Sequence, residues 1–313
     1  EMEAVQRDNP EGGDLALEHR GSGLGDGGLL ELHKMAETPL LLTMMVIVNY
    51  KQGLPNSRAL LYERLVQQLL FEWEHRRLDS KSSDLENLLE TAKLQKAELE
   101  VRLNELAFAV HDPTQSLDTV DIPEHRLLAA LKHAYASDLD DFDIDLAATT
   151  WAKKVLHLIS TRSGLINEVD IVGGEELPGR RPEATYQFVH RTFQEYLAAR
   201  WLATAVDDAE GEDISYSLIE ERIDQPQWRE AILLAFGYLT AVLPGATNRT
   251  ANLLHGLWPD LTRQPTLWPR TLLLGEAFIH LFGEERLGRV RNLKVREDLP
   301  ARVRQDLRRI MQD

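Results

Sequence analysis

Apolar side chains recur at helical spacing along most of the chain. The clearest stripe repeats every four residues and comprises Leu61, Leu65, Leu69 and Trp73. Asn56 and Ser57 precede it and are good helix caps, so a helix is predicted to start there. An earlier helix is predicted from Thr38 and Pro39 to Val48, because proline is tolerated in the first turn and the Gly53-Leu-Pro55 breaker follows.

The middle of the chain continues this helical pattern. Ser83 and Glu86 have the spacing of a capping box and predict one helix that runs to Val110, before the Asp112-Pro113 stop. Pro123 is expected to start another helix that ends near Ala136. The acidic run over residues 137–145 is expected to be a solvated loop, and residues 146–161 another helix.

The period changes after Gly164. Apolar and β-branched residues over 165–172 and again over 186–189 flank a stretch rich in glycine, proline and arginine at 173–182. This pattern predicts a β-hairpin with a long tip. Helices followed by a two-stranded hairpin are the layout of a winged helix.

The remaining sequence is predicted to be helical and is divided by prolines. The expected helices are 192–206, 214–223, 228–242, 248–257, 267–282 and 300–311. The fold class is therefore mainly α: a helical domain, a winged-helix domain with a small β-hairpin, and a second helical domain. The expected boundaries are a flexible lead-in over 1–28, the first helical domain over 29–80, the winged-helix domain over 83–206 and the second helical domain over 207–313.

Composition narrows the possible functions. The 313 residues include 35 basic and 51 acidic side chains, and the net charge of −16 disfavours nucleic acid as a partner. The absence of cysteine excludes disulfides and thiolate chemistry and fits a reducing, cytoplasmic location. The longest apolar run, over 39–48, is about half the ~20 residues of a membrane-spanning helix, so no membrane partner is expected. Since the chain opens at Glu1 and not at Met, we expect it to be a piece of a longer protein.

No catalytic or metal-binding motif is found. The sequence lacks the Gly-x4-Gly-Lys-Ser/Thr phosphate loop, and its ten histidines are scattered singly. The spacing of three glycines, Gly23, Gly25 and Gly28, matches the Gly-x-Gly-x-x-Gly pattern of dinucleotide-binding proteins. No strand is predicted before them, so a flexible loop is expected. The acidic run over 137–145 lacks the glycine and the final glutamate of a calcium loop. Carboxylates are too numerous for an acid pair to be selected from the sequence.

The segment over 186–199 is the most informative one. Thr192 is predicted to be the N-cap of a helix, with Glu195 closing a capping box. His190 then lies two residues before the cap, where a strand enters the helix. A helix N-terminus is electropositive, so the imidazole could contribute to an anion site. The alternative is a partly buried junction histidine without a ligand.

This segment also carries a family resemblance. The run from Phe188 to Ala199, Phe-Val-His-Arg-Thr-Phe-Gln-Glu-Tyr-Leu-Ala-Ala, resembles the end of the winged-helix domain in NACHT-type signal-transduction ATPases, which include the NOD-like receptors. Thr38-Pro-Leu-Leu-Leu-Thr43 is similar to the Asn-Pro-Leu-Leu-Leu-Thr motif of their first helical domain. The similarity continues in order through Arg162-Ser-Gly-Leu165 and Gln227-Trp228, and weakens after Leu243.

The resemblance implies a regulatory function. The Walker motifs would lie before residue 1, so this fragment would be non-catalytic and the intact protein an ATPase. His190 maps onto the histidine that contacts the ADP diphosphate, and Pro39 onto the proline beside the adenine. Thr38 departs from the usual asparagine. Implied cofactors are ADP or ATP with magnesium, and implied partners are the N-terminal nucleotide-binding domain and further copies of the protein on activation. Defence or stress signalling, including innate immunity and antiviral defence, is the implied context.

Two other functions stay open from the residues alone. A winged helix could be a DNA-binding regulator that reads duplexes through residues 146–161. That stretch and the residue after it offer only Lys153, Lys154 and Arg162 as cations. The chain could also be a helical scaffold that binds a protein and no nucleotide. If the imidazole of His190 faces the missing domain, His190→Ala should weaken ADP binding and cost the fragment little stability. A junction histidine with a buried partner would give the opposite pattern.

Overall fold

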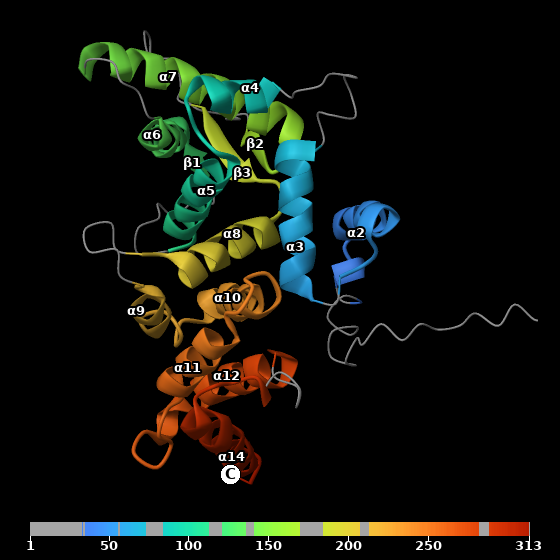
Figure 1. Ribbon diagram of the computed structural model, residues 1–313, viewed down its shortest axis with the longest axis vertical. Coiled ribbons are helices and arrows are strands. Elements are labelled where there is room, and N and C mark those ends of the chain that lie inside the picture. Colours follow the sequence, from blue (N-terminus) through green and yellow to red (C-terminus); the bar gives the residue numbers. More distant parts are fainter. Residues whose placement is uncertain are drawn as a thin grey trace, which may run out of the picture.

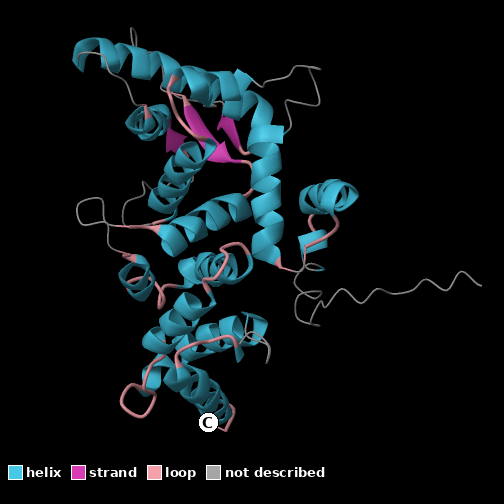
Figure 2. Ribbon diagram, in the orientation of Figure 1, coloured by secondary structure: helices cyan, strands magenta, loops and turns pink. Residues whose placement is uncertain are grey.

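The computed structural model describes residues 33, 35–55, 57–72, 84–112, 121–135, 141–169, 184–206, 213–281 and 288–312 (Figure 1). The described part is mainly helical with one small antiparallel sheet, as the sequence predicts (Figure 2). The sheet lies toward one end of an elongated molecule, and the last helices form the other end. The predicted lead-in over 1–28 with its glycine triplet lies outside the described residues.

The first two predicted helices are present. Helix α2 (Pro39–Gln52) begins at Pro39, and Gly53 ends it with a positive φ of 74°. Helix α3 (Arg58–Gln67) is capped by Ser57, whose hydroxyl accepts the Leu60 N–H at 3.2 Å, and continues into the π-helical turn η1 (Gln68–Glu72).

The single helix predicted from Ser83 to Val110 is wrong. The structure has α4 (Asp84–Thr91) and α5 (Lys96–His111), separated by a turn in which Lys93 has a φ of 55°. The Gln95 N–H donates to the Glu98 carboxylate at 2.6 Å and gives α5 its own start. Apolar periodicity resumes after the turn, so the pattern alone does not reveal the break. Ser83, the predicted cap, lies outside the described residues.

The next elements have the winged-helix order of helix, strand, two helices and hairpin. After α5 come β1 (Ile122–Pro123), α6 (Glu124–Ala134), α7 (Asp141–Leu158), the π-helical turn η3 (Ile159–Ser163), β2 (Ile166–Val169) and β3 (Thr185–Phe188). The sheet order is β1-β3-β2, with both pairs antiparallel. The predicted hairpin is confirmed. Strand β1 is a third strand that the sequence analysis missed, since two residues are too few to show a period.

The acidic run is not a loop throughout. Residues 141–145 belong to the first turns of α7, while 137–140 lie outside the described residues. Acidic side chains in the first turn of a helix are favourable because they oppose the positive end of its dipole. This explains why a run of aspartates can start a helix.

Helix α8 (Arg191–Thr204) lies at the centre of the molecule (Figure 1). It packs against α5 on one side and against α10 (Arg229–Ala241) on the other. Because it is covered on both sides, residues 193–200 are all buried. This helix therefore joins the winged-helix elements to the helices that follow.

The last third is a stack of short helices. They are α9 (Ser215–Glu220), η4 (Pro226–Trp228), α10, α11 (Thr247–Leu257), η5 (Pro265–Leu267), α12 (Trp268–Leu281) and α14 (Leu293–Ile310). Their order matches the predicted helices, apart from the last one.

The prediction that the last helix starts at Pro300 is wrong, since α14 begins at Leu293 and contains Pro300. Asn292 caps it by accepting the Val295 N–H at 3.3 Å. Proline within a helix removes one backbone hydrogen bond. A buried stripe at four-residue spacing, Val295, Leu299 and Val303, runs past the proline and keeps the helix continuous.

Candidate functional site

The N-terminus of α8 is built around His190. This residue has extended backbone angles, φ −141° and ψ 133°, and its Nδ1 accepts the Thr192 N–H at 3.3 Å. The Thr192 hydroxyl oxygen lies 2.8 Å from the same nitrogen. His190 is therefore the N-cap of α8.

The predicted capping box is wrong. Thr192 lies inside the helix, and Glu195 accepts a hydrogen bond from Arg191 Nε at 3.0 Å instead of closing the box. The Nδ1 atom of histidine occupies the same place in the side chain as the Oδ1 atom of asparagine, which is a good cap. Histidine is not among the usual capping residues, so the sequence pattern places the cap two residues too late.

The capping bond leaves His190 with a free donor. Since Nδ1 accepts the backbone N–H, the ring proton of the neutral imidazole is on Nε2. No hydrogen bond to Nε2 occurs within the described part of the chain, and the side chain is half-buried. A donor of this kind beside a helix N-terminus suits an anionic ligand.

Aromatic rings hold this helix end against α3. The ring of Tyr62, which is fully buried, lies edge-on to Phe193 with centroids 6.0 Å apart and stacks on Tyr196 at 5.5 Å. Burial raises the pKa of Tyr62, so the hydroxyl stays protonated at physiological pH. Such packing fixes the direction in which α8 begins.

Glu195 lies beneath the helix end. Its side chain is buried, and burial raises the pKa of its carboxyl, while the guanidinium of Arg191 opposes that shift. Glu230 on α10 raises the pKa further, and pairs with Arg58 at 3.1 Å. The first turns of α3 and α8 are thus linked to α10 through charged groups.

A buried charged cluster lies further along α8, and the sequence analysis missed it. Arg200 donates to Glu100 at 2.6 Å, and its other terminal nitrogen lies 3.6 Å from Glu63. Tyr196 donates its hydroxyl to Glu63 at 2.7 Å, and Gln67 donates to Glu100 at 2.7 Å. The cluster links α3, α5 and α8. The contacts that join the three helices span 33 to 137 residues of sequence, which is why no local pattern reveals the cluster.

Ionisation in this cluster follows from its geometry. Burial alone lowers the pKa of Arg200, but the carboxylate of Glu63 beside it raises the pKa above the ordinary arginine value. Burial raises the pKa of Tyr196 well above its ordinary value. One guanidinium, that of Arg200, therefore faces two carboxylates, those of Glu63 and Glu100. These carboxylates can accept more hydrogen bonds than the guanidinium donates, and the Tyr196 hydroxyl supplies one of the others.

Pro39 lies at a different place. It is exposed at the first position of α2, and its carbonyl accepts the Thr43 hydroxyl at 2.9 Å. The structure places Pro39 on α2 and His190 at the start of α8, two helices that both contact α3. The two predicted site residues are thus on separate helices that share one neighbour.

Within the described ranges, no group of three or more acidic or histidine side chains could hold a metal ion, and no helix is long and apolar enough to cross a membrane. On the helix suggested for DNA reading, Lys153 and Lys154 are exposed. Arg162, in the turn after α7, pairs with Asp84 at 2.6 Å.

Residues 58–202 match the family model described as the winged helix-turn-helix domain C-terminal to NACHT. Residues 58–202 are a NACHT-associated winged-helix domain. Neither a curated protein nor a solved structure matches the chain.

The matched segment covers just under half of the chain. The match begins at Arg58, the first residue of α3, and ends within α8 at Leu202. It contains His190, Glu195 and Arg200, whereas Pro39 precedes it. The division into domains at 29–80, 83–206 and 207–313 stays a prediction.

Proposed function

We propose that this chain is the regulatory lid of a NACHT-type ATPase and closes over the nucleotide-binding domain in the resting, ADP-bound state. The observation that carries the proposal is the free Nε2 donor of His190 at the N-terminus of α8, inside a winged-helix domain of the kind that follows NACHT. The nucleotide itself, with magnesium, would be held mainly by the NACHT domain of the same protein.

The residues of this chain would act by contacting the bound nucleotide. His190 Nε2–H would donate to the ADP diphosphate, and Pro39 would pack beside the adenine, as their counterparts do in the family that the sequence resembles. The capping bond to the Thr192 N–H holds the imidazole at the end of α8, and the packing of Tyr62 against Phe193 fixes that helix end against α3. Exchange to ATP would then favour an open state in which further copies assemble, in a defence or stress pathway.

A hydrogen bond to a charged group contributes roughly 1.5–3 kcal/mol, which corresponds to a shift between closed and open states of roughly ten- to a hundredfold. Loss of the His190 donor should therefore weaken ADP binding by that factor and favour assembly without a trigger.

The capping role of His190 determines how the test is designed. His190→Ala removes both the cap and the donor, whereas His190→Ser keeps a good cap but is too short to reach a phosphate. Both variants of the full-length protein should bind ADP more weakly by roughly ten- to a hundredfold, as measured by calorimetry. Light scattering should show that both variants assemble in the absence of the trigger.

If ADP affinity falls in His190→Ala but not in His190→Ser, then the cap, and not the donor, matters for nucleotide binding. Unchanged ADP affinity in both variants would contradict the proposal outright. The isolated 313-residue chain provides the control, because only the capping role of His190 can affect its stability.

A further inference from the structure

The outer side of helix α2 carries an apolar stripe that no described element covers. Its members, Pro39, Leu42, Val46 and Tyr50, recur at intervals of three or four residues, which places them on one face of the helix. The exposed fractions of Leu42, Val46 and Tyr50 are 46%, 61% and 91%, and Pro39 is exposed as well. We call this face the α2 stripe.

The inner side of α2 is also apolar, but it is buried. Leu41, Met44 and Val48 belong to the hydrophobic core, and α2 packs against α3 at the edge of the described structure (Figure 1). Rotation of the helix could not hide the α2 stripe, because it would expose these core residues instead. Only another surface can cover the stripe.

The α2 stripe differs in charge from other helix faces of this chain. From Thr38 to Tyr50 the sequence contains no charged residue, although 27% of the whole chain is charged. The Thr43 hydroxyl donates to the Pro39 carbonyl at 2.9 Å, so its proton is satisfied within the helix. Helix α14, by contrast, has one buried apolar stripe and is otherwise mostly charged or polar.

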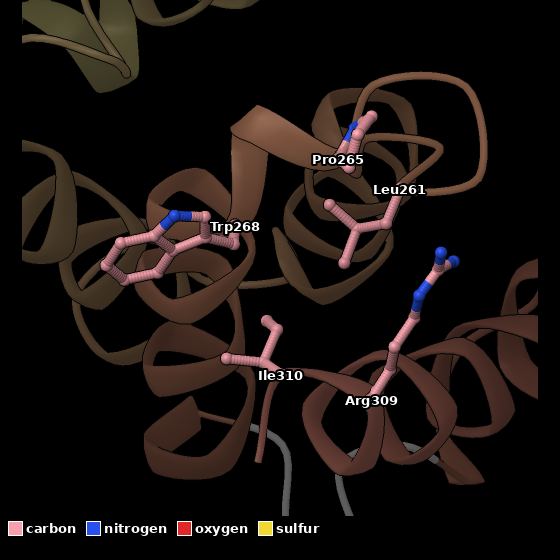
Figure 3. A pocket seen from close by; sticks show the side chains of 5 residues that line it. All are labelled: Leu261, Pro265, Trp268, Arg309 and Ile310. Atoms are coloured by element: carbon pink, nitrogen blue, oxygen red, sulfur yellow. The ribbon is translucent and has the colours of Figure 1, made fainter. Parts of the chain in front are cut away.

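A pocket at the end of the molecule formed by the last helices shows the same contrast. Its volume is about 300 Å³, and its lining combines apolar walls with the charged side chain of Arg309 (Figure 3). Surfaces that mix apolar and charged groups are ordinary where a protein meets water. A helix that is apolar on all sides is normally buried on all sides. The α2 stripe is therefore expected to be covered in the complete protein.

We propose that the α2 stripe docks permanently against an apolar, uncharged surface of the NACHT domain of the same protein. The winged helix at residues 58–202 is of the kind that lies C-terminal to NACHT. Helix α2 ends at Gln52, shortly before that match begins at Arg58, and so belongs to the stretch of chain between the two domains. Consecutive elements of a chain usually lie next to each other in space.

The absence of charge favours a permanent partner over a transient one. Interfaces that form and separate are about as polar as the rest of a protein surface, whereas permanent interfaces resemble a protein core. A second copy of the chain that docked here only on activation would leave the stripe exposed in the resting state. A domain of the same protein is always present, so it is the occupant that agrees with an uncharged stripe.

The α2 stripe also connects with the proposed nucleotide site. Pro39, which the proposed function puts beside the adenine, is the first residue of the same face. Docking of the stripe would hold Pro39 against the nucleotide-binding domain. The inference rests on the proposed function in one respect, that a NACHT domain precedes α2 in the protein. It does not depend on any nucleotide contact of His190.

The test uses thiol alkylation, because the 313-residue chain contains no cysteine. Val46→Cys adds one thiol to the middle of the α2 stripe, both in the 313-residue chain and in the full-length protein with ADP. N-ethylmaleimide is added, and mass spectrometry follows the peptide that contains residue 46. We expect alkylation to be roughly tenfold or more slower in the full-length protein, because a covered thiol reacts only when the interface opens.

Leu146→Cys is the matched control, since the Leu146 side chain on α7 is 65% exposed, close to the value for Val46. Its thiol should react at similar rates in the two proteins. Val46→Glu provides a second measurement that needs no thiol. It should leave the urea midpoint of the 313-residue chain unchanged, where the site faces water. It should lower the midpoint of the full-length protein, where the charge would be buried.

Equal alkylation of the Val46→Cys thiol in the two proteins would overturn the proposal, and so would equal slowing of the control thiol. Slow alkylation in the 313-residue chain would also overturn it. A rate that falls with protein concentration would identify a second copy as the occupant, and a rate independent of concentration would identify another segment of this chain. The nucleotide function fails separately, if His190→Ser leaves ADP affinity unchanged while the Val46→Cys thiol stays protected.

Discussion

His190 uses one ring nitrogen to cap α8 and keeps the other as a donor, so its two roles can be tested separately. In the isolated chain only the capping role of His190 contributes to the free energy of unfolding. His190→Ala should lower the free energy of unfolding by about 0.5–2 kcal/mol, and His190→Asn should restore most of it because asparagine is a good cap. Urea denaturation followed by circular dichroism measures both. Equal stability of all three proteins would show that the cap does not matter.

Arg200 should be far more sensitive than an exposed arginine on the same helix. Arg200→Met leaves Glu63 and Glu100 without their buried cation, which should cost about 3–5 kcal/mol of unfolding free energy. Arg191→Met removes an arginine whose side chain is 67% exposed, and its buried partner Glu195 keeps the charge of Arg58 nearby, so the loss should be smaller, about 1 kcal/mol. The difference in urea midpoints checks this prediction. Similar losses in the two variants would mean that the cluster is not a stabilising unit.

At the scale of elements, α5 is joined to the helices after α8 by a second buried cluster. Asp112 pairs with Arg222 at 3.0 Å, and the guanidinium of Arg222 lies over the rings of Phe108 and Trp228 at 4.7 and 5.3 Å. His111 Nε2 lies 3.0 Å from the Gln227 carbonyl and its ring is edge-on to Trp228. These contacts hold the winged-helix domain and the turn η4 together.

The contacts of this second cluster should weaken in mild acid. Burial lowers the pKa of His111 below its value in the unfolded chain, about 6.5. The unfolded state therefore binds the proton more readily, so the contribution of His111 to stability is complete above pH ~6.5 and falls as pH decreases below it. His111→Gln should flatten the stability curve between pH 7 and 5, measured by urea unfolding. His157→Gln, at an exposed histidine on α7, is the matched control, and an equal effect of both variants would contradict the assignment.

At the scale of the whole molecule, α8 is shared between the matched winged-helix domain and the helices that follow. Its Tyr196 ring packs edge-on against Tyr238 of α10, with centroids 6.3 Å apart. A fragment of residues 58–202 would expose that face of α8 to water, whereas residues 58–242 would keep it covered. We expect the shorter fragment to unfold at a lower urea concentration and to aggregate more readily. Equal urea midpoints would show that the domain is independent of α10.

The purified 313-residue chain should hydrolyse no ATP. Its sequence contains no Gly-x4-Gly-Lys-Ser/Thr loop whose backbone N–H groups could wrap phosphates. A phosphate-release assay checks this, with the full-length protein as the positive control. Steady hydrolysis that is lost on mutation within the chain would overturn this interpretation.

Local signals in the sequence predicted most elements of the fold. Helix periods, caps and prolines located helices such as α3 and α10, and the change to period two located the hairpin β2–β3. The run from Phe188 to Ala199 led to the winged-helix family, which the match over residues 58–202 confirms. Each of these features depends on residues that are close together in the sequence, so the sequence alone is enough to predict it.

Features that depend on contacts between residues far apart in the sequence became visible only in the tertiary structure. Strand β1 exists because Ile122 pairs with Tyr186, and Pro300 is tolerated within α14 because the stripe on either side of it is buried. The cluster around Arg200 and the pocket at Arg309 are assembled from segments far apart in the chain. Packing, burial and charge between such segments have no local period, and for that reason only the folded chain shows them.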